Sequence, residues 1–371
     1  MGWLDTPRKK ALLVMGAIAF AVILYLPQYY PRFRVVQFSE VIITAIAVLG
    51  LGLLTGYNGQ ISVGHAVFFG VGAYTTAIMV DNHGWPFLAT IPLAVVLSFV
   101  IGVLAGTPGL RIKGLYLALV TLALATLFPF FITRFSDVTG GSTGKSIPDF
   151  DAPDWSGLAD DQWVYYVLLA FAVPTFFLVR NLVKSRPGRA IIAIRDNETA
   201  AEVVGVNLAV YKVTTFGVSA AIAGLAGSLS MIVGSGRVDL GRDGSVVLES
   251  IQFLAAMVIG GAATIMGPIL GAAFVVFIPE FSSDVNPQLS QVIYGALLIV
   301  LMLVLPSGFM GGIRRLEAFT LHRLGRDQQW RRLPDGASDA PSSSDEPTAA
   351  DPPSPDDGPD AVSSDGTDAS D

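Results

Sequence analysis

Long runs of apolar residues constrain the fold of this chain more than any other feature. Eight of them have a length near the roughly 20 residues that an α-helix needs to cross a bilayer. They cover about residues 11–30, 36–55, 61–80, 86–106, 115–134, 163–181, 213–233 and 289–306. Because 52% of the 371 residues are hydrophobic and only 14% are charged, these runs exceed what a water-soluble core requires. The sequence predicts an all-α protein that crosses a membrane several times.

A ninth apolar run, residues 250–279, is too long for one comfortable crossing and short for two. A glycine-rich break and Pro268 lie in its middle, so we expect it to cross twice or to re-enter. Cytoplasmic loops collect Lys and Arg. The basic loops fall on one side only if this run enters and leaves on the same side, although Arg32 and Arg34 then lie outside. We expect about ten transmembrane or re-entrant helices, with both chain ends in the cytoplasm.

Composition divides the chain into segments. Residues 1–35 hold a basic N-terminal segment and the first span, residues 36–310 the membrane core, and residues 311–334 a second basic segment. Residues 335–371 contain ten Asp, one Glu and no basic residue, and removing this tail changes the net charge from −7 to +4. The tail lacks aromatic residues, so we expect it to be disordered and solvated. Its acidity suits a cytoplasm of high salt concentration, and a regulatory or binding role is the alternative.

Catalytic and cofactor signals are weak. The chain has no cysteine and three scattered histidines, His65, His83 and His322, so we expect no metal and no other cofactor. GGSTGKS, residues 140–146, resembles a phosphate-binding loop, but Thr139 stands where the first glycine is needed. If ATP drives transport, the ATPase is therefore another chain. The apolar runs also lack the relay of acidic or histidine residues that proton-coupled carriers use, which disfavours a secondary carrier or a membrane-embedded enzyme.

Residues 56–78, GYNGQISVGHAVFFGVGAYTTAI, interrupt the apolar pattern. At membrane depth such a break requires neighbouring protein or a watered cavity to satisfy the freed backbone groups. It lines a substrate pathway in one interpretation. In the other it is a tight cytoplasmic turn followed by a packing face of small residues, Gly64, Gly70, Gly72 and Ala73. The candidate pathway residues are Asn58, Gln60, Ser62, His65 and Tyr74. As a titratable group, His65 is a functional candidate, although a lone histidine near a helix start is more often a hydrogen-bonded packing residue.

Residues 185–207, SRPGRAIIAIRDNETAAEVVGVN, form the longest charged stretch with helical character. Ser185 suits a cap, Pro187 the first turn, and Gly205 with Asn207 the end, so we expect one helix. Small and apolar side chains share one face, namely Ala190, Ala193, Ile194, Ala201 and Val204, with Asn197 among them. Charged side chains point away, namely Arg189, Arg195, Asp196 and Glu202, with Glu198 at the border. Such a face either docks onto another protein or packs against the chain's own spans.

Five stretches together resemble the membrane permease of branched-chain amino acid ABC importers, most closely the subunit type called M. They are GYNGQISVGHAVFFGVGAYTTA, LRIKGLYLALVTLALA (residues 110–125), TGGSTG (139–144), SRPGRAIIAIRDNETAAEVVGVNLAVYK (185–212) and VIGGAATIMGPILGAA (258–273). The resemblance covers roughly residues 36–310. It implies a type II-like ABC importer permease fold. The family also includes permeases for urea and short amides.

The resemblance also implies that the loop 182–212 couples the permease to a cytoplasmic ATPase. The family pattern E-A-A-x-x-x-G is met by Ala200, Ala201 and Gly205, whereas Thr199 stands at the glutamate position and Glu198 lies one residue early. The candidate coupling residues are Gly188, Arg189, Arg195, Asn197, Glu198, Ala200, Ala201 and Gly205. Because Lys and Arg collect in cytoplasmic loops, the loop charges independently put this stretch in the cytoplasm.

The function implied is that of a multi-pass permease subunit in the plasma membrane, working by alternating access and without an ATPase site of its own. The expected partners are a second related permease subunit, two cytoplasmic ATPase subunits, an extracytoplasmic substrate-binding protein and the lipid bilayer; no nucleic acid is expected. The cargo is a branched-chain amino acid or, as the alternative, urea or a short amide. An ATP-independent secondary carrier is a further alternative.

Overall fold

The computed structural model describes residues 22–108, 114–148, 150–234, 236–238, 240, 245–285, 288–305 and 308–312. The chain divides into two units, residues 1–318 and 319–371, and every described residue belongs to the first. Most of the predicted first span, residues 11–30, lies outside the described residues, as do nearly all of the basic segment 311–334 and the whole acidic tail 335–371.

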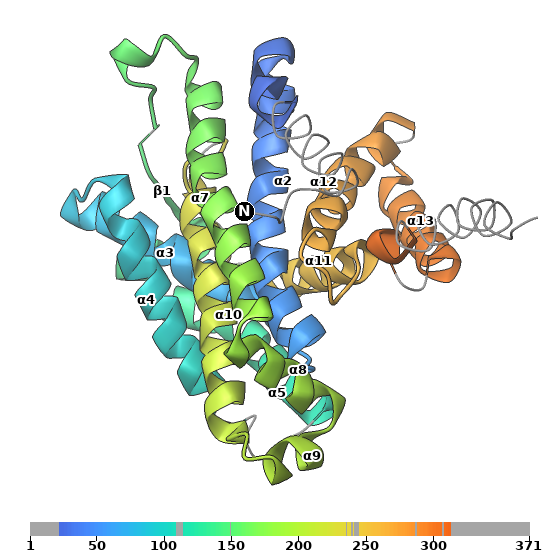
Figure 1. Cartoon of the computed structure of the whole chain (residues 1–371). Coiled ribbons are helices and arrows are strands. Elements are labelled where there is room, and N and C mark those ends of the chain that lie inside the picture. The colour runs from blue at the N-terminus through green and yellow to red at the C-terminus, as the bar shows by residue number, and fades with distance from the viewer. Residues whose placement is uncertain are drawn as a thin grey trace, which may run out of the picture. The chain divides into compact units, whose positions relative to one another are not determined.

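The described part is mostly helical, as expected (Figure 1). Its helices are α2 (Arg32–Leu51), continued by the π-helix η1 (Gly52–Tyr57), α3 (Ala66–His83), α4 (Phe87–Gly106), α5 (Leu115–Arg134), α6 (Ser136–Thr139), α7 (Asp160–Lys184), α8 (Arg186–Asp196), α9 (Glu198–Val203), α10 (Leu208–Ser230), α11 (Ser245–Gly260), α12 (Gly267–Val285) and α13 (Ser290–Val304). The 3-10 turns η3 (Gly141–Thr143) and η4 (Asp154–Ser156) lie between α6 and α7. A two-residue antiparallel pair, β1 (Lys145–Ser146) with β2 (Arg237–Val238), adds a small sheet to the all-α fold.

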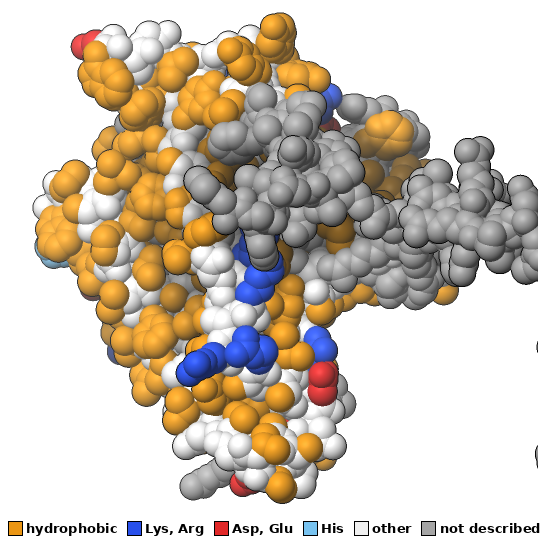
Figure 2. Space-filling view, viewed as in Figure 1, with side chains coloured by type: hydrophobic (Ala, Val, Ile, Leu, Met, Phe, Trp, Pro, Cys, Tyr) orange, Lys and Arg blue, Asp and Glu red, His pale blue; other side chains and the backbone are white. Residues whose placement is uncertain are grey.

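Six helical stretches of the described part are long and apolar enough to cross a membrane. They are α2 with η1, α4, most of α5, α7, α10 and the stretch 292–312 that includes most of α13. Many apolar side chains on these helices are exposed, among them Leu104 at 64% and Leu178 at 66%. Figure 2 shows hydrophobic side chains over most of the described surface of one face. Such a surface suits contact with lipid, so the structure supports a multi-pass membrane protein, while the expected number of about ten helices is not confirmed.

Helix α10 packs against α2, α3 and α4 through small side chains. Ala220, Ala223 and Ala226 are completely buried, which lets neighbouring backbones come close. Hydrogen bonds add to this packing: the Ser219 hydroxyl donates to the Gly50 carbonyl oxygen at 2.7 Å. These contacts fix α10 against the C-terminal half of α2, the half that leads into the polar break.

The long run 250–279 forms parts of two helices joined by a turn, as its glycine-rich break predicts. Helices α11 and α12 pack closely, and a Cβ atom on Gly271 would lie 1.8 Å from the Ala256 carbonyl oxygen. Pro268 occupies the first turn of α12, where its missing N–H leaves no helical hydrogen bond unmade. The run therefore folds back on itself within the described part of the chain.

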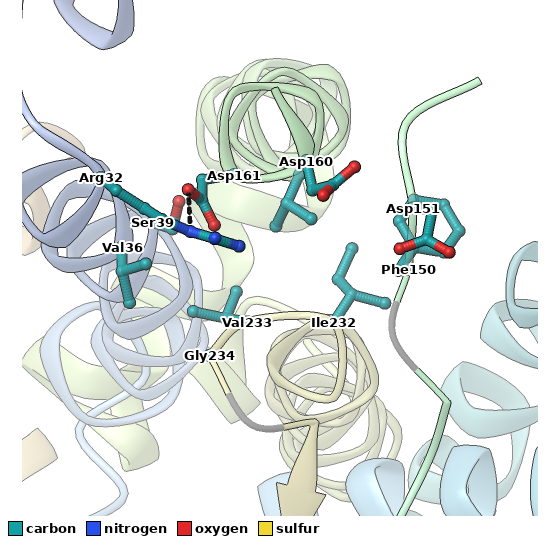
Figure 3. Close-up of a pocket in the computed structure, with 11 residues that line it drawn as sticks. Arg32, Val36, Ser39, Phe150, Asp151, Asp160, Asp161, Ile232, Val233 and Gly234 are labelled. Carbon is teal, nitrogen blue, oxygen red and sulfur yellow. Dashed lines mark ion pairs between the residues drawn. The ribbon is translucent and has the colours of Figure 1, made fainter. Parts of the chain in front are cut away.

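The two arginines that run against the loop-charge rule both have acidic partners. Arg32 pairs with Asp161 at the start of α7, with 2.6 Å between Nε and Oδ2. Figure 3 shows this pair on one side of a pocket that Asp160 and Asp151 also line. Arg34 pairs with Glu280 of α12 at 3.1 Å. Because each positive charge is matched locally, these arginines add little net charge to their side of the membrane.

A substitution in the α11–α12 contact tests this packing. Gly271→Ala is expected to lower stability by about 1 to 3 kcal/mol, the usual cost of overpacking, because the new methyl group collides with backbone rather than with a movable side chain. Thermal unfolding of the detergent-purified protein measures the effect. Gly295→Ala on α13 is the matched control, since no atom lies within 4 Å of its added Cβ. Equal melting temperatures for the two variants would contradict the packing.

Candidate functional site

The charged stretch 185–207 forms two helices, so the prediction of one helix was wrong. The backbone of Asn197 is extended, with φ −159° and ψ 108°, and separates α8 from α9. Its side-chain Oδ1 accepts a hydrogen bond from the Ala200 N–H at 3.0 Å. An Asn side chain competes in this way with the helical backbone, which is why Asn favours helix starts over helix interiors.

The start and the end of this stretch follow the sequence prediction. The Ser185 hydroxyl caps α8 by accepting from the Gly188 N–H at 3.4 Å. A Cβ atom at Gly188 would lie 2.2 Å from the Val183 carbonyl oxygen, so the sharp corner between α7 and α8 requires glycine. Arg189 also contacts this corner, through the Lys184 carbonyl oxygen at 3.3 Å. Beyond α9, Gly205 has a φ of +87°, as a glycine stop does.

The small-residue face of the stretch packs largely against the chain itself. Ile194 is 1% and Ala201 3% exposed, and Ala190 and Ala193 are half-buried, whereas Val204 is 77% exposed. Of the candidate coupling residues, Gly188 and Ala201 are buried, Glu198 is half-buried, and Arg189, Arg195, Asn197, Ala200 and Gly205 are exposed. The exposed residues of α9 are Thr199, Ala200, Glu202 and Val203, and the C-cap residue Val204 that follows is exposed too. An ATPase contact stays a prediction, but this surface, rather than Ala201, is available for it.

Two ionic side chains of the stretch point inward. The Glu198 Oε1 atom lies 2.5 Å from the Lys212 Nζ atom of α10, whose side chain is only 7% exposed. Arg195 donates from Nη1 to the Gly56 carbonyl oxygen at 3.0 Å. The Gln60 amide, in turn, donates to the Lys212 carbonyl oxygen at 3.1 Å. The two candidate sites, far apart in the sequence, therefore meet in space.

The polar break begins in the π-helix η1 and ends at α3. A Cβ atom on Gly56 would lie 1.7 Å from the Ala262 carbonyl oxygen, so the turn between α11 and α12 rests directly on this glycine. The apolar run suggested a helix from residue 61, but helix α3 begins at Ala66. Residues 58–65 are not helical. π-Helical turns of this kind occur often at functional sites.

Neighbouring helices supply hydrogen bonds to the backbone of this break. The Val63 N–H donates to the Thr121 hydroxyl of α5 at 3.0 Å, and the Ala66 N–H donates to the Ser250 hydroxyl of α11 at 3.1 Å. The predicted small-residue packing face is also present, since Gly64, Gly70, Gly72 and Ala73 are all buried. The small-residue packing face is therefore confirmed, whereas the cytoplasmic position of the turn and the substrate pathway both stay predictions.

Several polar side chains of the break are buried, and three of them have no hydrogen-bond partner among the described residues. Asn58 is 2% exposed and Ser62 and His65 are 0% exposed, and none of their side-chain nitrogen or oxygen atoms has a partner among the described residues. Gln60 is 7% exposed and Tyr74 5%. The His65 ring packs edge-on against Phe68, with 5.9 Å between the ring centres. Each buried unsatisfied group costs about 1 to 3 kcal/mol, so this arrangement is held by its surroundings.

A second polar surface lies between α2, α3, α11 and α12. A cavity of about 370 Å³ is lined by Glu40 of α2, Glu249 and Gln252 of α11, and the rings of Phe69 and Phe253. Neither carboxylate has a hydrogen bond or ion pair with another described residue. The sequence analysis gave no role to Glu249 or Lys212, although each is a charged residue at the edge of an apolar run, which is the signal that marks them.

The resemblance of residues 140–146 to a phosphate loop does not extend to its structure. The stretch leaves α6, passes through η3 and enters the short strand β1. A phosphate-binding loop leads from a strand into a helix N-terminus, whose N–H groups hold the phosphates. This segment has the reverse order.

Comparison with known proteins agrees with the helical membrane fold. Residues 36–302 match the family model described as the permease component of branched-chain amino acid transport systems. The chain is 30% identical over 333 residues to the high-affinity branched-chain amino acid transport system permease protein LivM of Salmonella typhimurium, covering 81% of this chain and 75% of the relative. It is 31% identical over 291 residues to LivM of Escherichia coli, covering 71% of this chain and 66% of the relative.

The permease protein LivH of the same transport system in Escherichia coli is a more distant relative. It is 25% identical over 297 residues, covering 72% of this chain and 91% of LivH. No solved structure matches the chain. Because the family model covers most of the chain and the LivM relatives reach 30% identity or more, the chain belongs to the permease components of branched-chain amino acid transport systems.

Proposed function

We propose that this chain is a permease subunit of an ATP-driven importer for branched-chain, hydrophobic amino acids. The match of residues 36–302 to the permease family carries this proposal. The relatives named LivM and LivH support a transporter with two related permease subunits. Two cytoplasmic ATPase subunits and an external binding protein complete the assembly, which sits in the plasma membrane. The permease itself has about ten crossing or re-entrant helices in a type II-like arrangement, with both chain ends inside.

In this proposal α8 and α9 form the contact with an ATPase subunit. The exposed valines at the end of α9, Val203 and Val204, offer a small apolar surface. The end of α7 and the start of α8 carry exposed basic residues, namely Arg180, Lys184, Arg186 and Arg189. Figure 2 shows Lys and Arg side chains gathered in the lower half of the view, near the place of α8 in Figure 1. Closure of the ATPase subunits on ATP moves this surface, and the spans then shift between two packings as rigid bodies.

The cavity beside α2 favours an amino acid over urea as cargo. Its two carboxylates suit the ammonium group of an amino acid, and the rings of Phe69 and Phe253 suit an aliphatic side chain. Urea is neutral and has no apolar part, so it gains little from either surface. The binding protein still selects the cargo first, and the cavity receives what is delivered.

Reconstitution tests the assignment as a whole. Proteoliposomes that contain this chain, its permease partner, both ATPase subunits and the binding protein are expected to take up radiolabelled leucine only when ATP is present on the side of the membrane that carries the ATPase subunits. Urea is the matched competing cargo. Leucine uptake by this chain alone, driven by an ion gradient, would instead make it a secondary carrier.

The docking surface is tested by Val203→Glu combined with Val204→Glu. These side chains are 83% and 77% exposed, so the change leaves the core intact while placing charge in the proposed interface. ATP-dependent uptake and retention of the ATPase during purification are both expected to fall on the order of tenfold or more. Val138→Glu, at a 45% exposed valine of α6, is the control. Unchanged uptake in the double variant would remove α9 from the contact.

The cargo assignment is tested by Glu249→Gln. Loss of one charge-assisted hydrogen bond to the ammonium group is expected to raise the KM for leucine roughly tenfold. Asp137→Asn, at an exposed carboxylate of α6, serves as the control. If both variants keep the wild-type KM, Glu249 does not contact the cargo.

A further inference from the structure

Glu198 turns away from the exposed surface of α9 and toward α10. Its carboxylate pairs with Lys212 at 2.5 Å, and the Lys212 side chain is only 7% exposed. An ammonium group in such a place needs an anionic partner, because water reaches it poorly. Helix α9 therefore cannot move away from α10 without leaving this charge uncompensated.

The α8–α9 junction contacts the polar break directly on one side and through α10 on the other. Arg195, at the end of α8, donates to the Gly56 carbonyl oxygen at 3.0 Å, where η1 comes to its end. The Gln60 amide donates at 3.1 Å to the main-chain carbonyl oxygen of Lys212 in α10, the residue whose side chain pairs with Glu198. A carbonyl group at a helix C-terminus carries partial negative charge and favours a cation beside it. Residues 56–60 are thus held by two hydrogen bonds, one to the Arg195 side chain of α8 and one to the Lys212 carbonyl oxygen of α10.

Buried polar side chains of the break would gain hydrogen bonds if these two contacts were lost and water entered. Asn58, Ser62 and His65 are buried, and their side-chain polar atoms have no partner among the described residues. Water would satisfy these groups if the break opened. An arrangement in which water reached these groups would relieve the cost of burying them, and contacts from outside the segment favour the buried one.

We propose that the pair Glu198–Lys212 and the contact of Arg195 with Gly56 form a latch, which keeps the polar break closed until α8 and α9 move. This inference rests on the proposed function, because the ATPase supplies that movement. Glu198, Lys212 and Arg195 are positioning residues: they act on the break through contacts and do not touch the cargo. The latch assigns Glu198 an internal role and leaves the ATPase contact to the exposed side of α9.

Thiol labelling tests the latch in the assembled transporter. The chain has no cysteine, so Ser62→Cys introduces its single thiol at a position that is 0% exposed. With the latch intact, reaction with a maleimide is expected to be slow without nucleotide and faster during ATP turnover. Adding Glu198→Gln is expected to speed the nucleotide-free reaction roughly tenfold and to remove its dependence on ATP.

Three further variants make the result specific. Glu202→Gln on the exposed side of α9 is the matched control and should leave labelling unchanged. Arg195→Gln removes the contact with Gly56, together with the ion pair to Asp196, and should act like Glu198→Gln. The exchanged pair, Glu198→Lys with Lys212→Glu, should restore slow labelling in part, which a general loss of structure would not do.

The outcomes separate the latch from the function on which it rests. If uptake stays ATP-dependent while Glu198→Gln and Arg195→Gln label as slowly as the parent, the latch is wrong and the importer stands. Equal acceleration by Glu202→Gln would also overturn the latch. If the parent transporter shows no ATP-dependent uptake, the proposed function itself fails, whatever the labelling.

Discussion

Buried backbone groups have no bulk water to bind, so the largely buried, non-helical stretch between η1 and α3 has to find its partners inside the protein. The rest of the described structure is arranged around this need. Thr121 of α5, Ser250 of α11 and Arg195 of α8 each contribute a hydrogen bond to backbone of the break or of its borders. The turn between α11 and α12 closes the remaining side by resting on Gly56. Helices from three separate parts of the sequence are thereby fixed to one short segment.

Local patterns predict the parts of this structure that depend on local physics. Apolar run length predicts most of the helices, because a crossing helix must be apolar along its whole length. The glycine-rich break with Pro268 predicts the reversal in 250–279, since both residue types favour a helix end. The cap at Ser185 and the stop at Gly205 follow from the side chain and backbone chemistry of single residues.

The errors and gaps arise where two tendencies compete or where distant residues meet. Helical periodicity runs straight through Asn197, yet the hydrogen bond from Ala200 to its side chain starts a new helix there. The burial of Ala201 and the inward turn of Glu198 depend on where α10 lies, and Lys212 is 14 residues away along the chain. No helical wheel of 185–207 contains that information. The carboxylates of Glu40 and Glu249 likewise share a cavity only because α2 and α11 pack together.

The π-helix η1 has a consequence for how this protein tolerates changes in length. A π-turn holds one residue more than an α-turn, so it rotates everything after it relative to the helix before it. Gly56 faces Ala262 only with that rotation in place. A one-residue deletion in Gly52–Tyr57 is expected to convert the turn to regular α-helix and to place a side chain where Gly56 now meets Ala262. This single turn thus determines which residue contacts the turn between α11 and α12. A residue cannot be removed from it without changing that contact.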